Sequence, residues 1–171
     1  MSAMMIATDD WLVLPWYSQV YVNGDDPPSD TIPAAEPMSS SACEGSTLLI
    51  FPSGSDVEIR VRAESWTTEP LTGDPRFDLE AATWTLHCPA GKLTVSNGGH
   101  GSSWSFPLPD PGSYQVRINA FHTDTRQLYD QALERSTDSD DPAFQIEVAK
   151  LTGRELWLLR LWPNKRPQDV A

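Results

Sequence analysis

Fifteen prolines and ten glycines divide the chain into short segments, and this division limits most strongly what the chain can fold into. Between the breaks, apolar and polar side chains alternate. The clearest case is residues 113–121, where Tyr114, Val116, Ile118 and Ala120 alternate with more polar neighbours. A period of two residues places successive side chains on opposite faces of a β-strand. The sequence therefore predicts a series of strands with few helices.

Strand-like segments recur about every 8 to 12 residues, which is typical of a sandwich or barrel. We predict an all-β fold, an antiparallel β-sandwich with about one short helix and long loops, in a single domain that spans residues 1–171. The helix is expected at 126–135, inside an acidic insertion at 123–150. The segment 29–45 is rich in Ser and Pro and lacks periodicity, so it is expected to be a long mobile loop.

Short turn sequences between neighbouring segments predict local strand pairing. Pro-Ser-Gly-Ser separates residues 47–51 from 57–61, and Pro-Ala-Gly separates 81–87 from 93–95. Each of these pairs is expected to form a hairpin. Further strands are expected over 12–23, 104–106, 144–150 and 155–162.

The acidic charge is the most informative bulk property. The formal net charge is -12, and residues 1–59 contain nine acidic residues and no Lys or Arg. Such a charge repels phosphate backbones and anionic lipids and attracts basic partners. We therefore expect a basic protein partner, with no direct nucleic-acid binding and no membrane association. A second interpretation stays open, in which the acidic charge only keeps the protein soluble.

Cysteine content and the N-terminal residues bear on the compartment. Two cysteines, Cys43 and Cys88, are too few for a disulfide scaffold, and residues 1–10 lack a basic region followed by a long apolar run. No segment reaches the roughly 18 apolar residues of a membrane span. These features predict a cytoplasmic location.

The residues that carry chemistry are sparse. His87, His100 and His122 are the only histidines, no Gly-x-Ser-x-Gly sequence occurs, and no His or Cys pair has the short spacing of a zinc site. We expect no catalytic site, no metal and no cofactor. Two alternatives remain: an enzyme built around the three histidines, and a carbohydrate- or small-ligand-binding module that uses the seven tryptophans.

Several segments together resemble the competence protein J-like family, small acidic proteins that inhibit a partner nuclease and are grouped with nuclease immunity proteins. Residues 14–28 are similar to the family's opening strand and acidic turn, and 45–63 to its second and third strands. Residues 103–121, with a Pro/Gly bend and a strand opened by Gly-x-Tyr, resemble its signature, and 155–163 its closing strand. The resemblance implies a β-sandwich and inhibition of a nuclease, most directly a DNase toxin.

A nuclease holds DNA in a basic groove, and an acidic inhibitor can place carboxylates where phosphates would lie. Two acidic clusters and two neighbouring aromatic side chains are the residues expected to bind the partner. An aromatic side chain would serve as an anchor, although a solvated turn or a core ring is the alternative interpretation. The expected partner-binding residues are Trp16, Tyr17, Asp25, Asp26, Asp30, Asp138, Asp140 and Asp141.

Overall fold

The computed structural model describes residues 2–26, 32–36, 39–71, 82–98 and 101–164. These residues form ten strands and two helices, and neither helix is long and apolar enough to cross a membrane. In chain order the elements are β1 Met5–Val13, β2 Val20–Asn23, β3 Ser41–Glu44, β4 Thr47–Ile50, β5 Ile59–Trp66, β6 Ala82–Cys88, β7 Lys92–Ser96, β8 Ser103–Pro107, β9 Gly112–Phe121, α1 Thr125–Glu134, α2 Pro142–Ala149 and β10 Leu156–Pro163.

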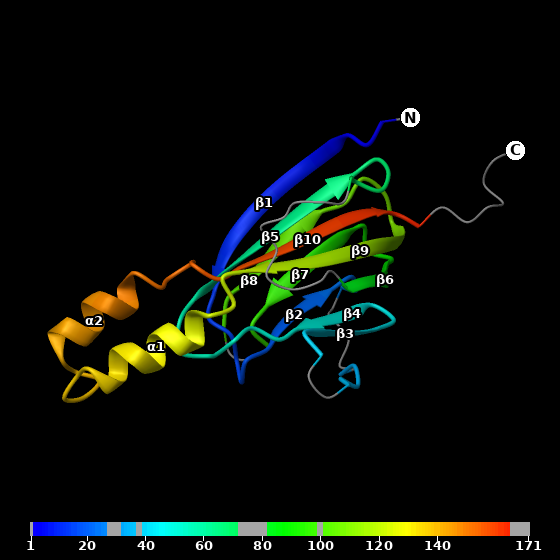
Figure 1. The fold of residues 1–171 in the computed structure, drawn as a ribbon. Coiled ribbons are helices and arrows are strands. Elements are labelled where there is room, and N and C mark those ends of the chain that lie inside the picture. Colours follow the sequence, from blue (N-terminus) through cyan, green and yellow to red (C-terminus); the bar gives the residue numbers. More distant parts are fainter. Residues whose placement is uncertain (1, 27–31, 37–38, 72–81, 99–100, 165–171) are drawn as a thin grey trace, which may run out of the picture.

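The strands form two five-stranded sheets (Figure 1). The first has the order β1-β5-β10-β9-β6 and the second β3-β4-β2-β7-β8. The prediction of a mostly β fold is confirmed, but purely antiparallel pairing is wrong, because β10 runs parallel to β5. α1 and α2 connect β9 to its antiparallel neighbour β10, which lies between β9 and β5 in the sheet. Neither sheet closes on itself.

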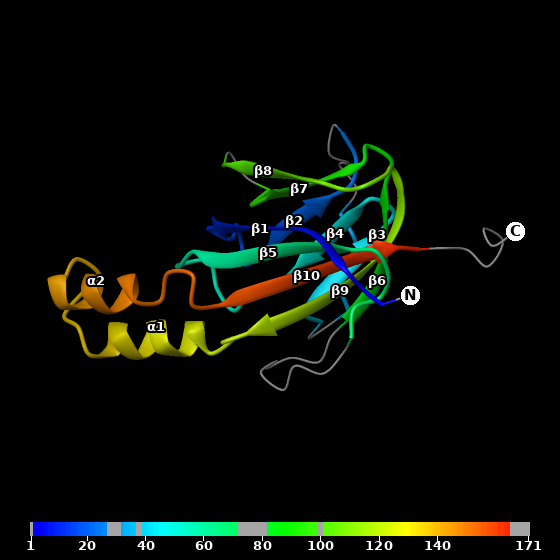
Figure 2. The ribbon, with the colours of Figure 1, turned by 90° about the horizontal axis from the view of Figure 1, so that it is seen from above.

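One hydrophobic core joins the two sheets. Phe106 and Leu48 enter it from the second sheet, and Val116, Leu159 and Trp157 enter it from the first. Figure 2 shows the two sheets as layers, with both helices projecting from one end. Among the strand tryptophans, Trp157 is fully buried in this core, whereas Trp84 and Trp104 are half-buried against its edge.

The predicted hairpins are wrong, although their strands exist. β4 and β5 lie in different sheets, and so do β6 and β7. All four residues of β4 are buried between β3 and β2, so β5 has no place beside it. The turns 51–58 and 89–91 therefore cross between the layers and do not fold a strand back on its neighbour.

The strand expected over 12–23 is divided into β1 and β2. The division falls at a tight turn, in which Trp16 and Gln19 form an isolated pair of backbone hydrogen bonds. The chain reverses there, so β1 and β2 enter different sheets.

The acidic insertion holds two helices where one was expected. α1 coincides with the predicted helix, but residues 144–150, predicted as a strand, belong mostly to α2. The side chain of Asp141 accepts a hydrogen bond from Ala143 N at 2.8 Å, and Pro142 occupies the first helical turn. Both are standard helix-start signals, and they override the apolar alternation that follows.

The predicted mobile loop over 29–45 is wrong near its C-terminal end, where residues 41–44 form β3. This strand pairs with β4. Ser41 is buried, and its Oγ accepts a hydrogen bond from Trp84 Nε1 at 2.9 Å. Residues 29–31 and 37–38 lie outside the described part of the chain.

The two cysteines lie where the edge strands β3 and β6 meet. Cys43 Sγ donates to the carbonyl of Thr85 at 3.5 Å, Cys88 is fully buried, and both are free thiols. Burial raises the pKa of Cys43 to about 11. The pKa of Cys88 is raised to about 12, mainly by burial and to a smaller extent by the nearby Asp25 and Cys43 side chains. Both thiols therefore stay protonated and unreactive at neutral pH.

We predict that a thiol reagent at pH 8 modifies both cysteines in the native protein about 100-fold more slowly than in urea, because the folded state holds few thiolates. Since the folded pKa values exceed the usual 9.0, their contribution to stability is complete below pH 9. It should decline as the pH rises toward 11 to 12. Urea unfolding of the wild type and of C43A/C88A measures that contribution, and equal pH profiles for the two would contradict it.

Candidate functional site

The partner-binding residues predicted from the sequence lie at two ends of the molecule. We call the end that carries the turn 14–19, the loop 51–58 and the helices the helical end (Figure 1). β2 runs from this end toward the opposite end, where Asp25 and Asp26 follow it. Asp30 lies outside the described residues. The structure therefore separates the two predicted acidic clusters.

The cluster after β2 is partly neutralised. Asp26 Oδ2 forms an ion pair with Lys92 Nζ at 2.5 Å, and both side chains are largely solvent-exposed. Asp25 is half-buried, close enough to Cys88 to raise the pKa of that thiol. Of these two carboxylates, only Asp26 forms an ion pair with a described residue.

The second cluster lies in the turn between α1 and α2 at the helical end. Asp138 Oδ1 accepts a hydrogen bond from Asp140 N at 2.9 Å, and Asp141 caps α2. These two carboxylates therefore hold the turn in shape. The Asp140 carboxylate is exposed and makes no hydrogen bond or ion pair with any described residue.

Trp16 and Tyr17 form an aromatic tip at the helical end. Trp16 N donates to Gln19 O at 3.1 Å, and Gln19 N donates to Trp16 O at 2.9 Å. Tyr17 and Ser18 both have positive φ, 49° and 56°, as the two central residues of a type I′ turn require. Asn-Gly usually fills these positions, so a Tyr-Ser pair stores roughly 1–3 kcal/mol of strain per residue.

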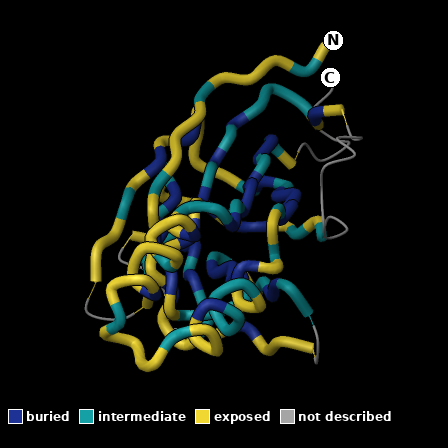
Figure 3. The backbone as a smooth tube through the Cα atoms, turned by 60° about the vertical axis from the view of Figure 1, so that its left-hand side comes forward, coloured by how far each residue is buried: buried dark blue, intermediate teal, exposed yellow. Residues whose placement is uncertain are grey.

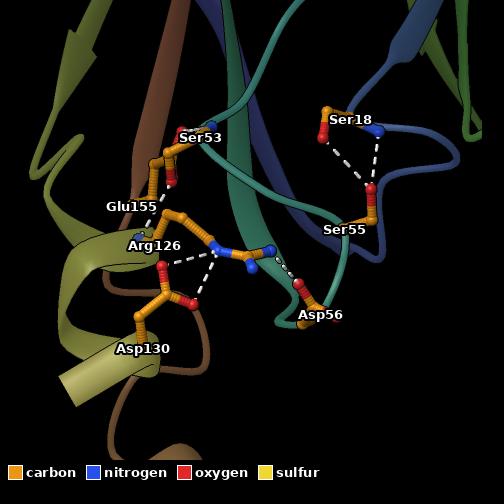
Figure 4. Close-up of polar contacts among 7 residues, drawn as sticks. All are labelled: Ser18, Ser53, Ser55, Asp56, Arg126, Asp130 and Glu155. Atoms are coloured by element: carbon orange, nitrogen blue, oxygen red, sulfur yellow. Dashed lines mark hydrogen bonds and ion pairs between the residues drawn. The ribbon is translucent and has the colours of Figure 1, made fainter. Parts of the chain in front are cut away.

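The strained turn presents an aromatic side chain to solvent. Tyr17 is 80% exposed, and its ring meets that of Trp16 edge-on with the centroids 5.1 Å apart. Strain of this kind persists only where the surroundings hold it. Here Ser18 N donates to Ser55 Oγ at 2.6 Å, so the loop 51–58 holds the turn (Figure 4).

A buried carboxylate fixes that loop in turn. Glu155 is only 1% exposed and precedes β10. Its carboxylate accepts hydrogen bonds from Ser53 N at 3.0 Å, from Ser53 Oγ at 2.5 Å and from Trp157 Nε1 at 2.8 Å. No sequence motif marks Glu155, and the sequence analysis missed it.

Arg126 attaches α1 to the same loop. Its guanidinium pairs with Asp56 at 2.7 Å and with Asp130 at 2.9 Å, and its backbone N donates to Ser53 Oγ at 3.3 Å (Figure 4). The Asp130 carboxylate raises the pKa of Arg126, mainly because it accepts a hydrogen bond from the guanidinium. The first turn of α1, the loop and the aromatic tip therefore form one connected unit.

A groove of about 520 Å³ on the outer face of the first sheet collects positive charge. Four arginines line it, together with one glutamate and an apolar floor. Three ion pairs link these arginines to carboxylates, Arg62 to Asp10, Arg154 to Asp124 and Arg160 to Glu64. This face is the least suited to a basic partner, so such a partner is expected to bind at the edges or ends of the sheets.

The described histidines do not form a common centre. His87 lies opposite Ser113 at the start of β9, and its Nδ1 is 2.8 Å from Ser113 Oγ. His122 directly follows Phe121 at the far end of the same strand. The third histidine of the enzyme hypothesis, His100, lies outside the described residues.

The tryptophans do not form an exposed row. Of the seven, Trp16 is exposed, Trp157 and Trp162 are buried, and the other four are half-buried. A carbohydrate-stacking face needs exposed flat rings, so this arrangement gives the carbohydrate alternative little support.

Comparison with known proteins finds a likeness in fold. No known family model matches the sequence, and no curated protein sequence matches it. The structure is similar to that of ComJ from Bacillus subtilis, an inhibitor of the DNA-degrading activity of NucA. The TM-score is 0.52 at 11% identity, over 95% of this chain and 99% of that chain. The structure of crocagin biosynthetic gene J is also similar, with a TM-score of 0.49 at 12% identity over 96% of this chain and 100% of that chain. The ComJ-like fold that the sequence suggested is therefore supported.

We predict that Glu155→Ala lowers the free energy of unfolding by about 3 kcal/mol, since one buried and two part-buried donors lose a charged acceptor. The Ser18 amide should also exchange with solvent faster, because Ser53 no longer fixes the loop that carries Ser55. Urea denaturation and hydrogen exchange measure the two effects. The control is Glu147→Ala, which removes an exposed ion pair with Lys150 and should change stability by less than about 0.5 kcal/mol. Equal losses in both variants would contradict the anchoring role of Glu155.

Proposed function

We propose that this protein is a non-enzymatic inhibitor that binds and neutralises a basic nuclease, most directly a DNase toxin, in the cytoplasm. In this proposal residues 1–171 act as one β-sandwich domain. The observation that carries it is the likeness in fold to ComJ, which extends over nearly the whole of both chains. ComJ inhibits a DNA-degrading activity, and the same kind of function fits an acidic protein of this fold.

The charge distribution supports a basic partner. The net charge of -12 acts over about 10 Å at moderate salt, so it attracts a cationic surface before contact. The first 59 residues supply nine carboxylates without a single Lys or Arg. Such a surface can fill a groove that evolved to hold phosphates.

The aromatic tip supports a specific contact in addition to long-range attraction. Tyrosine and tryptophan contribute strongly to binding where they are rigid and centrally placed. Tyr17 is both exposed and held in a fixed turn. It therefore loses little conformational freedom when a partner covers it.

Two properties of the described residues favour a binding role over catalysis. Both cysteine thiols have raised pKa values, which removes the thiolate that a nucleophile needs. His87 and His122 are held at opposite ends of β9. Neither arrangement matches a nucleophile with an adjacent base.

The direct test is inhibition of a nuclease encoded in the adjacent reading frame. We expect DNA degradation by that nuclease to stop at equimolar protein, with an association rate that falls steeply as salt rises. Stopped-flow binding at several salt concentrations measures the rate. An unimpeded nuclease, together with no basic protein captured from a lysate of the source at low salt, would refute the proposal.

Matched charge reversals identify which acidic end contacts the nuclease. Asp25→Lys and Asp140→Lys each change the net charge from -12 to -10, so both should slow long-range association equally. Neither carboxylate forms an ion pair with a described residue. The variant at the contact should in addition raise the dissociation rate by about tenfold or more. Because Tyr17 lies at the helical end, we expect the larger effect from Asp140→Lys; dissociation rates that do not change in either variant would exclude both acidic ends from the contact.

A conservative change tests the aromatic anchor. Tyr17→Asn keeps the positive φ, which asparagine tolerates, and removes the exposed ring. We expect an unchanged fold and an affinity that is lower by at least about 30-fold, the effect of losing a hot-spot residue. The control, Ile146→Asn, removes another exposed apolar side chain from α2 and should leave affinity within about twofold. Titration calorimetry measures both, and equal affinities would rule out Tyr17 as the anchor.

A further inference from the structure

The four edge strands of the two sheets differ in how they are protected. β3 and β6 lie against each other, joined by the hydrogen bonds from Trp84 Nε1 to Ser41 Oγ and from Cys43 Sγ to the Thr85 carbonyl. β8 has only five residues and ends in Pro107. β1 has nine residues, about 30 Å of strand, and pairs only with β5 among the described residues.

β1 has only part of the usual protection against pairing with another chain, namely the carboxylates of Asp9 and Asp10 and a register shift between Met5 and Ala7. Natural edge strands are kept apart by lysine, proline, short length or a covering element. The sequence of β1, Met-Ile-Ala-Thr-Asp-Asp-Trp-Leu-Val, contains no Lys, Arg or Pro. Figure 3 shows this strand, which follows the N-terminal label, exposed along most of its length.

Exposed apolar side chains gather on and beside the same strand. Of the eleven large apolar side chains exposed among the described residues, seven lie between Met4 and Tyr17. Concentrated apolar exposure of this kind marks an interaction surface. These seven side chains are Met4, Met5, Ile6, Leu12, Leu14, Trp16 and Tyr17.

The direction of the backbone groups of β1 follows from its neighbours. Arg60 N donates to Glu155 O, on the side of β10, and Leu12 lies opposite Arg60. Polar backbone groups of successive residues point to opposite sides of a strand. Thr8, Asp10 and Leu12 therefore direct their N–H and C=O groups away from β5, toward solvent. The hydrogen bond of Asp10 is consistent with this direction, because its N–H donates to the side chain of Asp9 at 2.9 Å and not to β5.

We propose that β1 is the docking edge for an extended, basic segment of a partner protein, which adds to the first sheet as a sixth strand. This inference rests on the proposed function, since it assigns the contact of the nuclease. Main-chain hydrogen bonds to Thr8, Asp10 and Leu12 supply affinity, and the flanking apolar side chains supply specificity. When the partner's carbonyl takes the Asp10 N–H, the Asp9 carboxylate is released to pair with a Lys or Arg of the partner.

Charge disfavours a second copy of this chain as the occupant. Antiparallel pairing of two β1 strands about their middle residue would place Asp9 of one copy directly opposite Asp9 of the other, with an Asp10 beside each of them. Like charges directly across a sheet are destabilising. A strand that carries Lys or Arg at the facing position has the complementary charge. The aromatic tip at Trp16 and Tyr17 continues this surface beyond the end of β1.

A proline placed at an outward N–H separates strand addition from other contacts. Thr8→Pro removes one outward donor, which an edge strand tolerates because that donor is not paired inside the sheet. Thr8→Ala keeps the donor and is the matched control. We expect Thr8→Pro to weaken nuclease binding at least tenfold while the alanine variant stays within twofold. Wild-type melting temperature and slow thiol modification in both variants verify the fold.

Residue-resolved hydrogen exchange on the complex gives a readout that does not depend on a variant. In the free protein, the amides of Thr8 and Leu12 should exchange fast and those of Asp9 and Trp11 slowly. Binding should protect Thr8 and Leu12. Fast exchange of both in a formed complex, or full inhibition by Thr8→Pro, would overturn the docking edge while leaving the proposed function intact.

Failure of the proposed function has a different signature, because the wild-type protein would then not inhibit the nuclease. In that case a synthetic peptide of about ten residues that alternates valine and lysine serves as the probe. Protection of Thr8 and Leu12 by the peptide in the wild type, and its loss in Thr8→Pro, would support the docking edge. No protection at millimolar peptide would overturn it.

Discussion

The buried carboxylate of Glu155 is the interaction on which the helical end of the molecule depends. It lies where the helical insertion returns to the sheet, and its three donors come from the loop 51–58 and from Trp157 in the core. A buried charge is costly unless its hydrogen bonds are made. The loop therefore has one low-energy position, and through Ser55 this position also holds the strained turn at Tyr17.

The chain separates its charges by face. Carboxylates dominate the first 59 residues, while four of the twelve Lys and Arg residues line one groove on the outer face of the first sheet. Ion pairs with Asp10, Asp124 and Glu64 reduce the field of that groove. Residues 123–150 of the helical end carry seven carboxylates against three Lys and Arg residues, and β1 carries two carboxylates and no Lys or Arg, so a cationic partner meets least repulsion in these two regions.

Sequence patterns predicted the strands better than their partners. The alternation over β9 and the helical spacing of α1 are local properties, and both elements were found where expected. Whether β4 pairs with β5 depends on distant strands that compete for the same edge, and no local pattern records that competition. The start of α2 was readable from Asp141 and Pro142, but the apolar residues after them were weighed as a strand.

The candidate surface was predictable only in part, for related reasons. Exposed carboxylates follow from composition, and Trp16 and Tyr17 were predicted as aromatic side chains that neighbour an acidic cluster. Glu155 did not, because nothing in its neighbours indicates that a glutamate is buried. The open edge of β1 is likewise a property of the sheet order, which places this strand outermost, with β5 on one side and no second strand among the described residues on the other.

The strained turn and the open edge are both unfavourable in an isolated protein. Asn-Gly would relieve the turn at Tyr17 and Ser18, and a single lysine would protect β1 from aggregation. Both features lie in one continuous stretch from Met4 to Ser18, which is also where most of the exposed apolar side chains are found. A partner that covers this stretch would satisfy the backbone groups of β1 and bury the ring of Tyr17 in one step. The apolar burial and the new backbone hydrogen bonds would supply binding energy, while the strained turn, already formed in the free protein, would hold Tyr17 in the position that the partner covers.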